Sequence, residues 1–327
     1  MVKTLPLIAL LALSSWIAPP GWCGAQPGKV YRIGYLALAP IAETPPPQRA
    51  AFLGAMEKLG YVQGKNLVIE YRSAEGNVES LPEVAADLVD QKPALIFAVG
   101  TPTALAAKQA TRTIPIVMFA ADAVANGIVA SLAKPGGNVT GVTSLLKLSP
   151  KRLEILKEAV PRASRVAVLY SRVHPSHAQE LTANQARARE LGLALQPFDV
   201  TLVEDLQAAF ARMSERRPDA ILVLFDYRTL IYRQLIAEFA TKNRVPTMFG
   251  SKESAHAGGL MSYGPSLEEM FTRAATFADR ILNGARPQTL PIEQPTRFEL
   301  AINLRTARSL GLRIPEPLLL RANVLIE

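Results

Sequence analysis

The feature that most constrains the fold of this chain is a strand–helix alternation that runs through the sequence twice. In the first half, β-rich or continuously apolar runs predict strands at residues 30–36, 67–71, 94–99, 116–119 and 139–142. Apolar residues at helical spacing predict helices between them, at 46–59, at 80–91 and from residue 102. Successive βαβ units with short connections favour a parallel sheet. The first half therefore predicts one parallel sheet covered by helices.

The second half repeats this pattern and is followed by a third block. Strands are predicted at 165–170, 194–200, 220–225 and 246–249, and helices at 149–160, 175–191, 201–216 and 230–241. The third block predicts a strand at 259–263, a helix at 266–283 and a strand at 298–302, with an irregular tail after Gly311. Thr201 and Ser266 each open a capping-box pattern. We therefore predict an α/β fold of two doubly wound parallel-sheet lobes joined by a multi-strand hinge.

We also expect specific lobe boundaries. A length of 327 residues fits two domains, and no Pro/Gly-rich linker separates the halves. We expect the chain to cross between lobes near residues 143–147, 252–258 and 286–297. The N-terminal lobe would then comprise residues 29–143 plus 258–288, and the C-terminal lobe residues 144–257 plus 289–327.

The first 25 residues have the pattern of a signal peptide. Lys3 precedes an apolar stretch at residues 5–18, which is short for a membrane span. Cys23 and Ala25 place small residues at positions −3 and −1 of a cut before Gln26. An uncleaved membrane anchor and a lipid anchor on Cys23 are the alternatives, and the large Trp22 disfavours the second. We predict a cleaved signal peptide and a soluble product in the periplasm, since no later run of 18 apolar residues follows.

Most enzyme signatures are missing from the sequence. It contains no G-x-S-x-G elbow, no phosphate-binding P-loop and no dinucleotide fingerprint after a strand. A single cysteine excludes Cys-rich metal sites, and the pair His174 and His177 is expected in an exposed loop rather than on a metal. The net charge of +8 is dispersed along the chain, which does not favour nucleic acid. We therefore expect no catalytic residue, no metal, no cofactor and no nucleic-acid partner.

Candidate binding residues lie where predicted strands end. Ligands of open α/β sheets bind outside the carboxyl ends of the strands, next to helix N-termini. Gly100-Thr101-Pro102 has the residues of such a ligand-facing turn, although an ordinary strand-to-helix turn has the same pattern. The candidate ligand-binding residues are Thr101, Pro102, Asp122, Ser144, Tyr170, Asp226, Tyr227 and Ser251.

Two pairs among these candidates have specific expected roles. Asp122 and Asp226 are expected to face each other across the lobes and to hold donor groups such as an amine. Tyr170 and Tyr227 would offer stacking faces to an aromatic or heterocyclic ligand, or would only cover the rim of the cleft.

Several long strings in this chain are specific to one family. They are LGYVQGKNLVIEY at residues 59–71, GTP at 100–102, LAKPGGNVTG at 132–141, AGGLMSYGP at 257–265 and EQPTRFEL at 293–300. With these strings the chain resembles the ABC-transporter substrate-binding proteins of the type I periplasmic binding fold, in the group that includes tryptophan and tyrosine importers. Asp122-Ala123 and Ser171-Arg172 depart from the Asp-Pro and Asn-Pro pairs that are common in this group. The ligand is therefore left open.

The resemblance implies two hinged lobes that close on a small molecule. The ligand would be amino-acid-like, aromatic or heterocyclic, and the partner would be an ABC permease in the inner membrane. The resemblance also implies a binding protein without catalysis, and we expect a monomer. A secreted α/β enzyme such as a hydrolase and a ligand-sensing receptor module are the alternatives. The missing nucleophile motif disfavours the enzyme, and the leader-like N-terminus disfavours a DNA-binding regulator.

Overall fold

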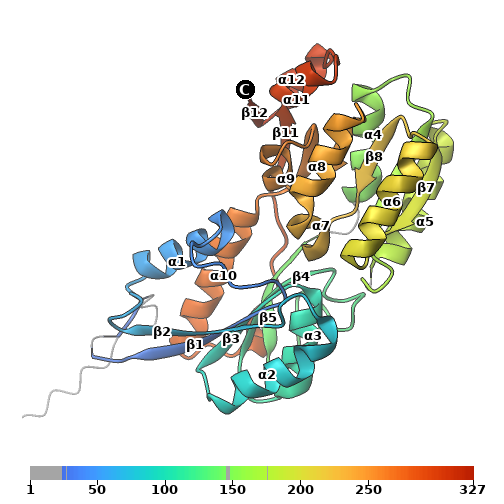
Figure 1. The fold of residues 1–327 in the computed structure, drawn as a ribbon. Coiled ribbons are helices and arrows are strands. Elements are labelled where there is room, and N and C mark those ends of the chain that lie inside the picture. Colours follow the sequence, from blue (N-terminus) through green and yellow to red (C-terminus); the bar gives the residue numbers. More distant parts are fainter. Residues whose placement is uncertain (1–23, 27, 145–147, 175) are drawn as a thin grey trace, which may run out of the picture.

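A five-stranded parallel sheet organises the first lobe (Figure 1). The computed structural model describes residues 24–26, 28–144, 148–174 and 176–327. The strands of the first sheet are β1 (Tyr31–Ala37), β2 (Leu67–Ser73), β3 (Leu95–Val99), β4 (Ile116–Ala121) and β5 (Val139–Ser144). They lie in the order β2-β1-β3-β4-β5, and all neighbouring pairs are parallel. The predicted parallel sheet of the first half is confirmed.

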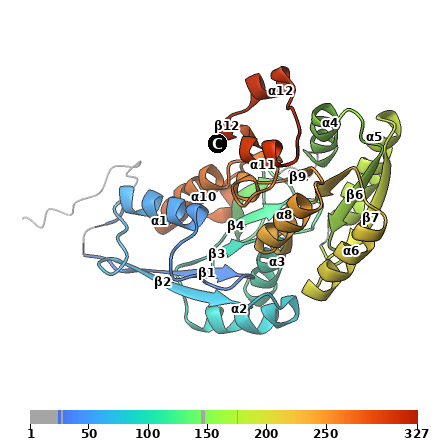
Figure 2. The same ribbon diagram turned by 45° about the horizontal axis from the view of Figure 1, so that its top comes forward.

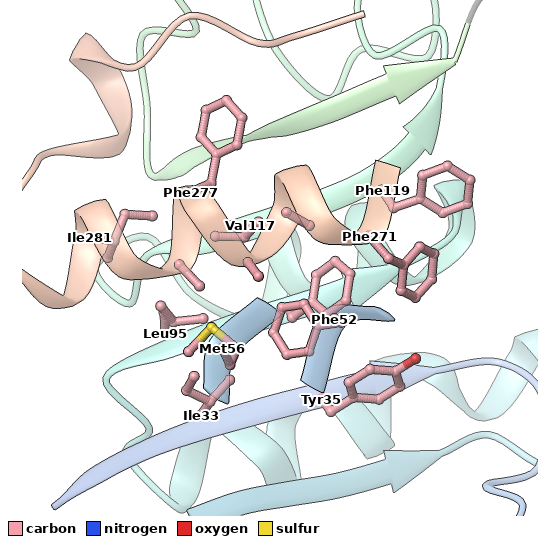
Figure 3. Close-up of a cluster of buried hydrophobic side chains, with 14 of the residues drawn as sticks. Ile33, Tyr35, Phe52, Met56, Leu95, Val117, Phe119, Phe271, Phe277 and Ile281 are labelled. Carbon is pink, nitrogen blue, oxygen red and sulfur yellow. The ribbon is translucent and has the colours of Figure 1, made fainter. Parts of the chain in front are cut away.

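Helices cover both faces of this sheet (Figures 1 and 2). They are α1 (Pro47–Lys58), η1 (Val78–Ser80), α2 (Leu81–Asp90), α3 (Thr101–Ala110) and, from late in the chain, α10 (Leu267–Leu282). Side chains alternate along β1, so that Ile33 packs with Phe52 and Phe271 of α1 and α10, whereas Leu36 packs with Leu88 of α2. Figure 3 shows the first of these two cores.

The second lobe contains a seven-stranded sheet. Its strands are β6 (Arg165–Tyr170), β7 (Ala194–Asp199), β8 (Ala220–Val223), β9 (Thr247–Phe249), β10 (Met261–Pro265), β11 (Phe298–Asn303) and β12 (Val324–Ile326). They lie in the order β12-β11-β10-β9-β8-β6-β7. The pair β10–β11 is antiparallel, whereas the other pairs are parallel. The sequence did not indicate this reversal, which arises because the chain re-enters from the other lobe before it forms β11.

The helices of the second lobe pack on both sides of its sheet. They are α4 (Ser149–Ala159), α5 (His177–Glu190), α6 (Val203–Glu215), α7 (Tyr227–Ile231), α8 (Arg233–Lys242), α9 (Lys252–His256), α11 (Leu304–Ser309) and α12 (Glu316–Arg321). The expectation of an irregular tail after Gly311 is wrong. Leu318 of α12 is buried in the core, and β12 pairs with β11. The apolar residues of the tail thus complete the second lobe.

The chain crosses between the lobes at places that correct the predicted boundaries. β10 pairs with β9 and β11, so it belongs to the second sheet, although the predicted range 258–288 put it in the first lobe. The crossing lies between β10 and α10, not at 252–258. Glu293 still exchanges backbone hydrogen bonds with Gly141 and Thr143 of β5, so the return crossing follows it rather than residue 288. The expected crossing at 143–147 lies partly outside the described residues, because residues 145–147 are not described.

Candidate functional site

A cavity of about 100 Å³ lies between the two lobes, at the carboxyl ends of β3 and β4. Most of the residues that line it are apolar, among them Leu38, Val99, Phe119, Phe225, Leu230, Leu267 and Phe271. The rings of Phe119 and Phe271 have centroids 5.4 Å apart and lie at the end of the core toward which the strands point (Figure 3). Polar groups enter the cavity from Gln48, Thr101, Ser144, His174 and Asp226. An apolar cavity with few polar groups is typical of a small-molecule site.

Asp226 contributes a buried carboxylate to this cavity. It lies between β8 and α7, and its side chain is 3% exposed. Oδ1 accepts hydrogen bonds from the backbone N–H groups of Arg228 and Thr229 and so caps α7. Oδ2 is buried and finds no hydrogen-bond partner among the described residues. Burial raises the pKa of Asp226, although the nearby His177 opposes this shift. A donor group on a ligand would satisfy Oδ2.

The N-terminus of α3 enters the same cavity from the first lobe. Gly100 precedes the helix with φ of +111°, a conformation that favours glycine. Its N–H donates to the carbonyl of Phe119 at 2.8 Å, and the N–H of Ala121 donates to Thr101 Oγ1 at 3.0 Å. These two bonds fix the helix start against β4. A helix N-terminus has a partial positive charge and suits a carboxylate.

Two stacked histidines lie at the cavity, where His174 contributes to the lining and His177 does not. The rings of His174 and His177 have centroids 4.1 Å apart, and His177 is fully buried. The N–H of Ser171 donates to His177 Nδ1 at 2.9 Å. Burial, together with His177 and Arg228, lowers the pKa of His174 to about 3, and burial also lowers that of His177. The expectation of an exposed loop is thus wrong for His177. Over the described ranges, no group of three or more His, Cys, Asp or Glu residues could hold a metal ion.

Two buried groups of opposite charge, Arg152 and Glu180, lie beside Phe225. Arg152 and Glu180 line a small cavity of about 30 Å³ beside Phe225, and both side chains are buried. Arg152 Nε donates to the carbonyl of Tyr263 at 2.7 Å. Burial raises the pKa of Glu180 to about 7, against the attraction of Arg152. The second lobe therefore contains a carboxyl group that titrates close to neutral pH.

Comparison with known proteins identifies the family. Residues 47–326 match the family described as ABC transporter substrate binding protein. This chain belongs to that family. Substrate-binding proteins of ABC transporters bind small molecules outside the cytoplasm for a membrane permease and are normally not enzymes. Within the described residues, no helix is long and apolar enough to cross a membrane.

Individual relatives cover most of the chain. A Clostridioides difficile (strain R20291) protein named tyrosine-binding protein is 27% identical over 281 residues, which are 85% of this chain and 81% of that protein. A conserved domain protein from Vibrio cholerae is 27% identical, with a TM-score of 0.84 over 91% of this chain and 100% of that one. The ligand-free, open structure of a Clostridium difficile substrate binding protein with adhesive properties is 26% identical. Its TM-score is 0.65, over 91% of this chain and 99% of that one.

The cavity brings together four of the eight candidate residues of this substrate-binding protein. They are Thr101, Pro102, Ser144 and Asp226. Thr101, Pro102 and Ser144 come from the first lobe, whereas Asp226 comes from the second. The expectation that strand ends from both lobes meet at one cleft thus agrees with the geometry.

The other candidates lie elsewhere. Asp122 Oδ1 accepts a hydrogen bond from the N–H of Ala125 at 3.1 Å, so this carboxylate holds a turn. Tyr170 packs against the core of the second lobe, and Ser251 is buried with its Oγ 3.3 Å from Ser254 Oγ. Among the described residues that line the cavity, none of these three appears. Asp226 lines the cavity and Asp122 does not, so the two carboxylates do not face each other there as expected. The side chain of Tyr227 lies outside the described part of the structure.

Sequence reasoning missed the aromatic wall. Phe119, Phe225 and Phe271 line the cavity but were not candidates. Phe225 directly precedes Asp226, so the strand-end rule itself could have found it. Phe271 lies on α10, whose apolar pattern indicates only a core helix and not the cavity that its first turns reach.

Proposed function

We propose that this substrate-binding protein captures an aromatic amino acid or a close analogue between its lobes, as the periplasmic component of an ABC importer. The proposal rests above all on Asp226, whose buried Oδ2 finds no donor among the described residues and lies in an aromatic cavity. A buried acceptor without a partner costs free energy that a ligand ammonium would recover. The relative named tyrosine-binding protein supports this ligand class.

The charges around the cavity are complementary to the ammonium and carboxylate groups of an amino acid. Asp226 offers a negative group from the second lobe, and the N-terminus of α3 offers a partial positive charge from the first. An α-ammonium would pair with Oδ2, and an α-carboxylate would meet the N-terminus of the helix beside Thr101. Phe119, Phe225 and Phe271 would then pack against the ligand ring.

Closure of the lobes would complete the site. Each lobe supplies part of the wall, and Asn126 Nδ2 of the first lobe donates to Ser176 Oγ of the second at 3.0 Å. The Clostridium difficile structure described as open has the lower TM-score, although its sequence identity nearly equals that of the Vibrio cholerae protein. We infer that the two structures differ in the separation of their lobes. We therefore propose a hinge motion around the ligand.

Location, assembly and chemistry complete the proposal. A signal peptide cleaved before Gln26 would release a soluble monomer into the periplasm, where it meets its permease. Intact-mass measurement of the exported protein tests this, with a lipid-modified Cys23 or a retained Met1 as the contradicting results. We also propose that the protein binds its ligand without converting it chemically. Ligand recovered chemically unchanged after incubation agrees with this, whereas a product would contradict it.

A thermal-shift screen of amino acids, purines and small carboxylates tests the ligand class. A ligand at 100 times its Kd stabilises the native state by about 2.7 kcal/mol, which raises the melting temperature by several degrees. We expect a concentration-dependent rise with aromatic amino acids and saturable one-to-one heats in calorimetry. No rise with any aromatic amino acid would contradict the proposal.

A further inference from the structure

A second cavity, of about 240 Å³, lies next to the aromatic cavity. The two cavities share the lining residues Leu38, Gln48, Val99, Leu230 and Phe271, so they are direct neighbours. Together their volumes reach the range of about 300–1,000 Å³ that is usual for small-molecule sites. The first cavity alone is therefore small for an aromatic amino acid, and the second offers room for the far end of its side chain.

Unpaired polar atoms gather around the second cavity. Gln48 Oε1, Arg49 Nε and both carboxylate oxygens of Glu253 are buried and find no hydrogen-bond partner in the described part of the chain. Gln48 and Arg49 come from α1 of the first lobe, and Glu253 comes from α9 of the second. Buried polar groups are normally paired, so several unpaired ones around one cavity indicate a missing polar partner.

Arg49 is held firmly in this position. Its side chain is 5% exposed, and one of its terminal nitrogens donates to the carbonyl of Ala42. Its guanidinium carbon lies 5.5 Å from the centroid of the Tyr71 ring. Among the described ion pairs within 4.0 Å, neither Arg49 nor Glu253 takes part, so the two opposite charges do not satisfy each other. Arg49 Nε therefore remains a fixed donor without a partner, in a cavity that Gln48 and Glu253 also line.

We propose that this second cavity binds the polar end of the ligand's aromatic side chain, and that the protein thereby selects a hydroxylated aromatic amino acid over one with a plain phenyl ring. A phenol hydroxyl can donate to Glu253 or Gln48 and accept from Arg49 Nε. A phenyl ring would leave these groups unpaired, which penalises its binding. This inference rests on the proposed function, because it assumes that the α-ammonium lies at Asp226.

Calorimetry with L-tyrosine and L-phenylalanine tests the inference. The intact protein should bind L-tyrosine about 10- to 100-fold more tightly. Glu253→Gln and, separately, Gln48→Met should reduce this preference about tenfold, mainly by weakening L-tyrosine. Glu268→Gln is the matched control, because Glu268 pairs with Lys252 next to Glu253 and is absent from the described lining of both cavities. It should leave the preference unchanged.

The outcomes separate the inference from the proposed function. Equal affinities for the two amino acids in the intact protein would overturn the inference and leave the proposed function standing. So would an equal loss of both ligands in Glu253→Gln and Gln48→Met, since these residues would then act on closure or folding. No binding of either amino acid, with binding of a non-aromatic ligand instead, would overturn the proposed function and the inference with it.

Discussion

Replacing Asp226 by Asn isolates the charge that the proposed site needs. Asn caps helices about as well as Asp, so Oδ1 can still accept from the N–H groups of Arg228 and Thr229. The substitution turns the unpaired Oδ2 into an NH₂ group, which cannot accept a hydrogen bond from an ammonium. The fold should therefore persist while the ligand loses its charged partner.

The size of the effect follows from the burial of this carboxylate. A hydrogen bond to a charged group contributes about 1.5–3 kcal/mol, which corresponds to a roughly 10- to 150-fold weaker Kd. The oxygen is fully buried, so solvent screening does not reduce the effect. The new NH₂ group also faces the ammonium donor to donor. The loss should therefore fall in the upper part of this range.

Isothermal titration with L-tyrosine or L-tryptophan at pH 7 measures this loss. Asp122→Asn is the matched control, because Asp122 also follows a strand and accepts a backbone N–H, but is absent from the described lining of the cavity. Its φ of +32° is tolerated by Asn. We expect the control to bind like the unaltered protein. Unaltered affinity in Asp226→Asn, with both variants melting normally, would refute the placement of the ligand.

Three further predictions follow from the geometry of the site. The pKa of Glu180 is raised from 4.5 to about 7, so the native state retains a proton that the unfolded state releases across this window. The free energy of unfolding should therefore fall by about 3 kcal/mol as pH rises from about 4.5 to 7. Urea denaturation at several pH values measures this. The free energy of unfolding should change less with pH in Glu180→Gln than in the unaltered protein, and the same dependence on pH in both would contradict the assignment. Thr101→Val leaves the N–H of Ala121 without its acceptor and should weaken binding about tenfold, whereas Thr101→Ser should restore both binding and stability. Small-angle scattering should show a smaller radius of gyration when a confirmed ligand is added, and superimposable curves would exclude the closure.

The elements of the fold were predictable because their signals are local. The continuous apolar run at 94–99 became β3, and Ser266 Oγ accepts from the N–H of Glu269, as the capping pattern predicted. Thr201 did not cap its helix, because its hydroxyl bonds to Asp199 and the helix begins at Val203 with Asp205 accepting from Leu202 N–H. The hydrogen bond from Thr201 to Asp199 thus takes the place of the predicted cap.

Which strands and helices lie next to each other was harder to predict than the strands and helices themselves. The pattern at 259–263 indicates a strand but not its neighbours, so β10 was placed in the wrong lobe. The same limit applies to the site. The strand-end rule predicted Thr101 and Asp226, which line the cavity, but it also predicted Tyr170, which packs against the core of its own lobe. The wall residue Phe271 depends on where α10 crosses, which no local signal encodes.

A crystal structure of the protein grown with L-tyrosine tests the central claim most directly. We predict one molecule between the lobes, with its ammonium within hydrogen-bond distance of Asp226 Oδ2 and its ring against Phe119, Phe225 and Phe271. Its carboxylate should meet the N-terminus of α3. Closed lobes with L-tyrosine bound elsewhere, or with Asp226 Oδ2 turned away from the ammonium, would contradict the account.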